Sequence, residues 1–276
     1  DTNRIGPSWG NAGHIATEQT EPLATPAALA SSLRRLHVFG GPLDVRRAWA
    51  LLPWIARYVQ ACSPRRAANG RAALTRLLGS AMPAWRRLLD ALDQPTLLRE
   101  GGHRVVWESA DTGRRGRERW LASPTGTASW NDLDEGMRLS LETTLRVPLA
   151  GGIVFSGTGQ ITDLPRLADA LATAFTAAGG VRRHDRVLAL RDDAGHARAL
   201  LEDGNVIEAD CIVVCAGAQS SALMRDVGET VPLIAERGYH LQWTDHDWPA
   251  QPPLVFEDRS IIVTRFESGL RVAGFV

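Results

Sequence analysis

The chain has 276 residues, 44% of them apolar, which is enough for one large domain or two ordinary ones with a substantial core. Acidic and basic residues balance at 31 each, and all the basic residues are arginine, so no overall field draws the protein to nucleic acid. The chain has too few cysteines for a disulfide scaffold. No apolar stretch approaches the roughly 20 residues that a transmembrane helix needs, which excludes an integral membrane protein. We expect a cytoplasmic location and leave peripheral attachment to the inner membrane open.

The chain begins with a glycine-containing stretch, SWGNAGHIATEQTEP at residues 8–22. Chain ends usually fray, so a stretch of this composition predicts contact with something that orders it. From Thr25 to about Leu98, apolar residues recur at three- and four-residue spacing and prolines interrupt the pattern. This spacing predicts three or four helices that carry no catalytic constellation.

After Gly102 the pattern changes to short strands, with HRVVWES as the clearest, and we expect a small sheet that extends to LRVPLAGGIVFS. The next segment, TDLPRLADALATAFTAAGG, predicts a helix. Asp163 can cap its N-terminus, Pro165 lies in the first turn, and Gly179 and Gly180 end it.

Three further strands are predicted in RVLALRDD, ARALLEDG and NVIEADCIVVCAGA. The run IVVCAGA is typical of a strand that is buried on both faces of a parallel sheet, so Cys211 and Cys215 are expected to be buried. From Val231 onward, the alternation in YHLQW, SIIVTRF and LRVAGFV predicts antiparallel strands of a second sheet.

Few motifs with a defined chemistry are present. The turn from Gly157 to Thr162 has the start of a dinucleotide fingerprint, but threonine occupies the third glycine position, which favours a plain turn. An NAD-dependent dehydrogenase that uses this turn remains an alternative. The sequence contains no C-x-x-C or H-E-x-x-H, and its histidines are scattered, so it predicts no metal site.

Two distant glycine-containing stretches remain, SWGNAGHI near the start and VVCAGAQSSALM at residues 213–224. In the second stretch, the small residues Ala216, Gly217 and Ala218 would let the backbone approach a bulky ligand. A tight strand-to-helix turn explains the same residues equally well. We expect both stretches to contact one bound dinucleotide.

These stretches resemble the FAD-dependent amine oxidoreductases of the D-amino-acid oxidase family, and within it the bacterial D-amino-acid dehydrogenases. The resemblance rests on SWGNAG, DLPRL with VRRHDRVLAL, ADCIVVCAGAQSSAL, VPL with RGYHL, and IIVTRFESGLRVAG. It implies a mixed α/β fold. Residues 1–36 and 160–230 would form the remnant of a Rossmann-like FAD-binding domain without its first βα unit. Residues 37–159 and 231–276 would form a substrate domain with an antiparallel sheet and helices, in a chain truncated at both ends.

The resemblance implies FAD as cofactor and a D-amino acid or related amine as substrate. The C–N bond would be oxidised to an imine, which hydrolyses to a keto acid, and the electrons would pass to a quinone or to oxygen. No nucleic acid is expected as a partner. The FAD contacts that it implies are Asp1, Ser8, Asn11, Ala12, Gly13, His14, Val187, Ala216 and Gly217.

For the substrate carboxylate, an arginine is the physical choice, because its planar fork matches two oxygens. We predict Arg265 as this residue and Tyr239 as a hydroxyl donor; pairing of Arg265 with Glu267 or Glu257 is the alternative. No side-chain base is strictly required, so no catalytic residue is named. Two other functions stay open: an inactive flavoprotein fragment, or a non-catalytic interaction module that uses the helices of residues 25–98.

Overall fold

The computed structural model describes residues 6–35, 48–193, 195–233, 235, 238–249 and 252–275. The chain forms two compact units, which we describe separately. The larger unit comprises Asp1–Leu171 and Tyr239–Phe275, and the smaller unit comprises Ala172–Gly238 with Val276. Within the described ranges, no helix is both long and apolar enough to cross a membrane.

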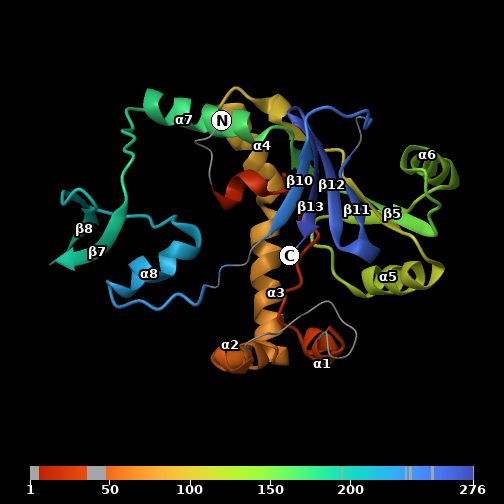
Figure 1. Ribbon diagram of the computed structural model, residues 1–276, viewed down its shortest axis with the longest axis horizontal. Helices are drawn as coiled ribbons and strands as arrows, with labels where there is room; N and C mark the ends of the chain where they lie inside the picture. Colours follow the sequence, from red (N-terminus) through yellow and green to blue (C-terminus); the bar gives the residue numbers. More distant parts are fainter. Residues whose placement is uncertain are drawn as a thin grey trace. The chain divides into compact units, whose positions relative to one another are not determined.

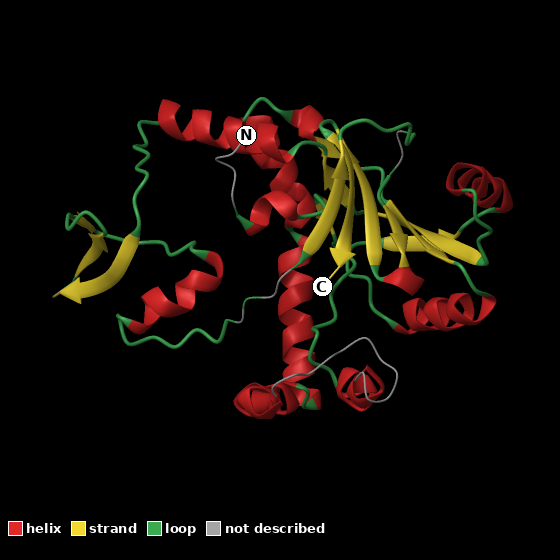
Figure 2. Cartoon of the chain, viewed as in Figure 1, coloured by secondary structure: helices red, strands yellow, loops and turns green. Residues whose placement is uncertain are grey.

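A seven-stranded sheet dominates the larger unit, in the order β10-β13-β12-β11-β3-β5-β4 (Figures 1 and 2). Neighbouring strands are antiparallel except β11 and β3, which are parallel. The sheet predicted after Gly102 and the antiparallel strands predicted after Val231 are therefore one sheet. Its strands are β3 (His103–Trp107), β4 (Ser129–Asp132), β5 (Gly151–Ser156), β10 (Tyr239–Trp243), β11 (Leu254–Phe256), β12 (Ile261–Phe266) and β13 (Gly269–Phe275).

The two faces of this sheet carry different residues and are named separately below. Side chains alternate along a strand, and residues paired across strands share a face. The face that bears His103, Thr264 and Arg271 is called the strip face below, because the N-terminal residues cross it. The face that bears Val106 and Val263 is called the core face.

One helix covers each face of the sheet. Helix α5 (Ala110–Ala122) packs on the strip face, where Trp120 meets Phe155 edge-on at a ring separation of 4.9 Å. Helix α6 (Glu135–Leu145) packs on the core face, where Leu141 joins an apolar cluster that includes Val106 and Leu254.

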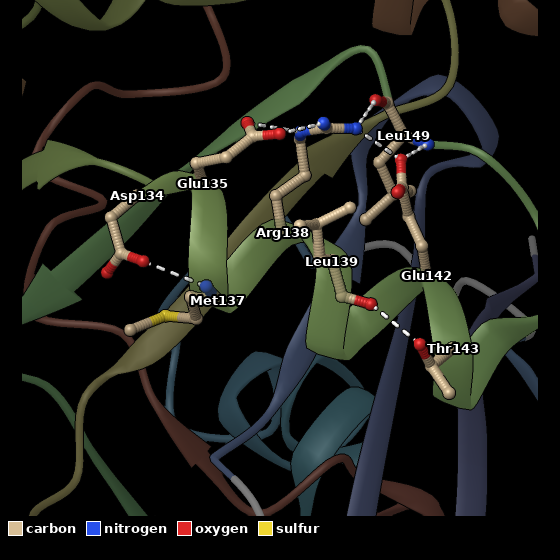
Figure 3. A network of polar contacts seen from close by, with 8 residues as sticks. All are labelled: Asp134, Glu135, Met137, Arg138, Leu139, Glu142, Thr143 and Leu149. Atoms are coloured by element: carbon tan, nitrogen blue, oxygen red, sulfur yellow. Dashed lines mark hydrogen bonds and ion pairs between the residues drawn. The ribbon is translucent and has the colours of Figure 1, made fainter.

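Helix α6 is tied to the loop before β5 by a network of polar contacts (Figure 3). The Asp134 carboxylate caps the helix, because its Oδ1 accepts the Met137 N–H at 2.8 Å. Arg138 donates to Glu142 at 2.6 Å, and the same Glu142 oxygen accepts the Leu149 N–H at 2.7 Å. The cap and the loop contacts therefore fix both ends of the helix against the core face.

Replacing Asp134 by alanine is expected to lower the free energy of unfolding by about 1 kcal/mol, because the N–H at Met137 loses its partner. Urea denaturation would measure the change. Asp134→Asn is the matched control, since asparagine caps helices as well as aspartate does. Equal loss in both variants would show that the charge of Asp134, rather than the cap, stabilises the helix.

The helical region that precedes the sheet agrees with the prediction of three or four helices. The described residues contain α1 (Pro26–Arg35), α2 (Ala48–Ala61), α3 (Pro64–Gly79) and α4 (Ala81–Ala91). Helix α4 buries Met82 and Leu89 against a small sheet of order β1-β6-β2. The strands of this sheet are β1 (His14–Ile15), β2 (Leu98–Arg99) and β6 (Gly159–Ile161), and short 3-10 turns lie at Pro7–Gly10, Pro95–Leu97 and Glu257–Arg259.

Helix α7 (Leu164–Ala177) confirms the cap predicted from the sequence. Asp163 Oδ1 accepts the Arg166 N–H at 2.7 Å, and Gly179 follows the helix with a φ of +86°. Beyond it, the smaller unit contains an antiparallel sheet in the order β7-β8-β9. Its elements are β7 (Val187–Asp193), β8 (His196–Leu201), β9 (Val206–Ala209), the 3-10 turn Gly217–Gln219 and α8 (Ser220–Arg225).

The predicted burial of the run IVVCAGA is wrong. Strand β9 ends at Ala209, and residues 211–216 form no strand. Cys211 and Cys215 are exposed, and Val213 is 79% exposed. A doubly buried strand needs a neighbour on each side, and the described part of the chain pairs none with this run. The mixed α/β class is confirmed, with β11 and β3 as the one parallel pair among the described strands.

Candidate functional site

The stretch at residues 8–20, called the strip below, has a locally fixed shape. Asn11 sets it: the side-chain Nδ2 donates to the Ser8 carbonyl at 2.6 Å, and Oδ1 accepts the Gly13 N–H at 2.7 Å. An asparagine that closes turns in this way replaces the hydrogen bonds of a regular element. This local closure explains why an asparagine stands between two glycines.

The protein itself anchors the strip. Ile161 donates its N–H to the Gly13 carbonyl at 2.8 Å, as part of the contact between β1 and β6. Further along, the fully buried Thr17 and Thr20 donate their hydroxyls to the carbonyls of Gly157 and Pro124, at 2.9 and 2.7 Å. These contacts anchor the strip to the larger unit, and contact of the strip with a ligand stays a prediction.

Gly13 occupies a position that accepts only glycine. Its φ of +65° lies in the left-handed region. A Cβ added there would lie 2.7 Å from a ring carbon of Phe266 and 2.8 Å from the Ile161 carbonyl oxygen. The lack of a side chain thus lets the strip lie directly on the end of β12.

Arg271 joins the strip to the sheet and carries a buried charge. It is 7% exposed, and its Nη1 donates to the Asn11 carbonyl at 2.5 Å. Nε and Nη2 donate to Gln242 Oε1 at 3.1 and 2.6 Å, and the guanidinium lies 4.8 Å over the Phe266 ring. Burial lowers the pKa of Arg271 below its usual value.

No acidic side chain among the described residues pairs with the charge of Arg271. All its polar contacts within the described residues are to neutral oxygens. Three of its five N–H donors are engaged, so two remain for a ligand. A buried cation without a counter-ion is destabilising unless an anion reaches it. This arginine can therefore bind a carboxylate at the edge of the strip.

Arg271 is a candidate site residue that the sequence-based prediction did not include. The neighbours of Arg271 on the same face of β13 are Gly269 and Ala273, both small residues. An arginine between two small residues at alternate strand positions is the signal that could have identified it.

The predicted substrate residues lie elsewhere. Arg265 is on the core face of β12, opposite the strip, and its Nη1 donates to the Trp248 carbonyl at 3.0 Å. The two acids considered as its partners bind other arginines: Glu267 binds Arg166, and Glu257 binds Arg119. Tyr239, at the end of edge strand β10 beside a bulge, is 56% exposed.

A second polar group, made of His14, Glu18 and His103, lies buried beneath the strip. Glu18 Oε1 lies 3.5 Å from His14 Nε2 and 3.9 Å from His103 Nε2. Burial alone would raise the pKa of the Glu18 carboxyl, but the two imidazoles hold it below its usual value. Burial lowers the pKa of His103 to about 4, so this imidazole is neutral at pH 7.

The predicted FAD contacts fall in both units. In the larger unit, Ser8 and Asn11 are exposed, Ala12 is half-buried, and His14 turns its side chain into the buried group. In the smaller unit, Val187 begins β7, and Ala216 and Gly217 are exposed. Gly217 has a φ of +56° and no atom within 4 Å of an added Cβ. Asp1 lies outside the described residues.

The turn that begins at Gly157 does not have the form of a nucleotide site. It connects strand β5 to strand β6, and the side chains of Thr158 and Thr162 are buried. The helix that follows is capped by Asp163, which places a negative charge where a phosphate would bind. The NAD-dependent alternative therefore lacks its binding loop.

Comparison with known proteins identifies the family. The model of the DAO family, described as FAD dependent oxidoreductase, matches residues 3–276. The chain belongs to this family. A D-amino-acid oxidase of Bradyrhizobium diazoefficiens is 27% identical over 98% of the chain, and D-amino acid dehydrogenase 2 of Pseudomonas aeruginosa is 28% identical over 98%.

The relatives of this DAO family member are longer than the chain. The chain spans 64% of the Bradyrhizobium protein and 65% of the Pseudomonas protein. Among solved structures, glycine oxidase from Geobacillus kaustophilus superposes with a TM-score of 0.60. At 19% identity, covering 98% of the chain and 60% of the oxidase, this match shows a shared fold.

Proposed function

We propose that the chain is part of a FAD-dependent enzyme that oxidises the C–N bond of a D-amino acid or related amine to an imine, which hydrolyses to a keto acid. The observation that carries the proposal is the buried guanidinium of Arg271, which binds the strip through Asn11 and pairs with no acidic side chain among the described residues. Membership of the DAO family supports the cofactor, and the names of the relatives support the substrate class. When bound, FAD supplies the acceptor for the hydride equivalent.

The strip is the part of the larger unit that we propose lies along FAD. Its inner side is fixed to the sheet, while Ser8 and Asn11 remain exposed on its outer side. Because the His14 side chain points into the buried group, this residue would meet FAD through its backbone. Asp1, Val187, Ala216 and Gly217 remain proposed contacts, as do Ala12 and Gly13.

Arg271 is proposed to hold the substrate carboxylate. Its two remaining N–H groups can donate to the two carboxylate oxygens, and Gln242 fixes the orientation of the guanidinium. Holding the carboxylate orients the α-carbon, and orientation alone can contribute several kcal/mol to a rate. Tyr239 remains a proposed hydroxyl donor.

The test is reconstitution of the chain with FAD, followed by incubation with D-alanine and an artificial electron acceptor. We expect retained yellow flavin and formation of the keto acid. Keto acid formed with the artificial electron acceptor but without oxygen consumption would indicate a quinone as the natural electron acceptor. Oxygen consumption would indicate oxygen as the electron acceptor. A chain that retains FAD but forms no keto acid from any D-amino acid would contradict the proposed reaction.

A further inference from the structure

The buried group of His14, Glu18 and His103 has the composition of a transition-metal site. Each residue offers one ligand atom, and these atoms all lie within 4.8 Å of one another. Neutral imidazole and carboxylate are ligands that zinc and its first-row neighbours take in proteins. We propose that this group, called the His₂Glu cluster below, binds one divalent transition-metal ion of the zinc class.

Buried polar atoms without partners are the main support for the proposal. Among the described residues, Glu18 Oε2 and both ring nitrogens of His14 have no hydrogen-bond partner, and the nearest approach is the 3.5 Å between His14 Nε2 and Glu18 Oε1. The Glu18 side chain is 2% exposed and that of His14 is 9% exposed. Buried polar groups are almost always satisfied, and a buried carboxylate without donors is particularly unfavourable. A cation between the three side chains would satisfy one ring nitrogen of His14 and the carboxylate of Glu18.

Two of the three ligand–ligand distances are close to those of a bound state, and the third is at most 4.8 Å. Ligand atoms of a tetrahedral zinc ion lie about 3.4 Å apart, because each bond is about 2.1 Å long. Glu18 Oε1 lies 3.5 Å from His14 Nε2 and 3.9 Å from His103 Nε2. Modest side-chain rotations therefore complete the coordination, and the fourth position is left for water.

Thr158 and Phe155 hold His103 in the orientation that coordination needs. His103 Nδ1 lies 2.9 Å from the hydroxyl of Thr158, which is fully buried. With its proton on Nδ1, His103 directs the Nε2 lone pair toward Glu18. Phe155 stacks on the His103 ring at 4.5 Å and fixes the ring plane.

The test is metal binding by the full chain after treatment with a chelator. Co²⁺ is added and followed by its visible absorption, and Zn²⁺ is followed by calorimetry. We expect one Co²⁺ per chain with the absorption intensity of a four-coordinate site, and a rise in Tm with added metal. Glu18→Gln should weaken Co²⁺ binding by about 100-fold or more, and Thr158→Val by about 10- to 100-fold.

Glu208→Gln is the matched control. Glu208 lies 3.5 Å from His196, the distance found in the His₂Glu cluster, but both side chains are at least half exposed. This variant should bind Co²⁺ as tightly as the parent does.

The proposal is overturned if the parent chain binds no stoichiometric Co²⁺, or if folded Glu18→Gln binds it as tightly as the parent. Circular dichroism establishes folding. Should Glu18→Gln not fold, unchanged binding by folded His14→Gln, which removes another of the three ligands, overturns the proposal. FAD takes no part in these measurements, so they are independent of the proposed oxidation.

Discussion

Replacing Arg271 by methionine is expected to raise KM and lower kcat/KM for a D-amino acid by about 100- to 1,000-fold in the FAD-loaded chain. Loss of one partner of a buried charge pair typically costs about 2–5 kcal/mol, and each 1.4 kcal/mol is tenfold. Methionine keeps an unbranched apolar chain like the aliphatic part of arginine, while it removes the guanidinium that lies over Phe266 together with its charge and donors. Steady-state kinetics at varied amino-acid concentration would measure the loss.

Arg265→Met is the matched control, because Arg265 lies on the neighbouring strand but on the core face. This variant should leave KM near its parent value. If Arg265→Met raises KM and Arg271→Met does not, the carboxylate is held by Arg265, and our proposal for Arg271 is wrong. Retention of FAD in both variants would show that the effect concerns the substrate.

Replacing Gly13 by alanine is expected to lower the free energy of unfolding by about 2–4 kcal/mol. The left-handed conformation accounts for about 1 kcal/mol or more, and collision with Phe266 and the Ile161 carbonyl adds to it. The Ile161 carbonyl belongs to the backbone, so it cannot rotate away as a side chain can. We also expect weaker retention of FAD, since the strip must move off the sheet.

Gly151→Ala separates the two contributions to this loss. Gly151 also has a positive φ and belongs to the larger unit, but no atom lies within 4 Å of an added Cβ. Urea denaturation should show a clearly smaller loss for Gly151→Ala than for Gly13→Ala. Equal losses would show that backbone conformation, and not the close approach of strip and sheet, makes glycine necessary at Gly13.

Local signals predicted much of the fold. The cap at Asp163 and the glycine at Gly179 fix the ends of α7, and the alternation after Val231 marks the last strands. Pairing between distant strands has no such signal: nothing in HRVVWES shows that β3 lies beside β11. The burial predicted for the run IVVCAGA was wrong for the same reason. Hydrophobicity indicates a preference for burial, but it does not show whether a neighbouring strand is present.

The candidate site was predicted in part. The glycines and Asn11 directed attention to the strip, since these residue types signal unusual backbone. Arg265 was predicted and Arg271 was not considered. Both alternate along strands, and the face that each occupies depends on the register of three strands. The His₂Glu cluster matches no spacing motif, because His14 and Glu18 come from the strip and His103 from a distant strand.

The parallel pairing of β3 with β11 has a consequence for synthesis in the cell. Val105 pairs with Val255, so the ribosome adds roughly 150 residues after β3 before its neighbour exists. At about 5–20 residues per second, this takes roughly 8–30 s. During that interval the valines of β3, fully covered in the finished protein, lie at an open edge that invites wrong pairing. The nascent chain should therefore depend on chaperones more than a protein whose sheet closes from consecutive hairpins.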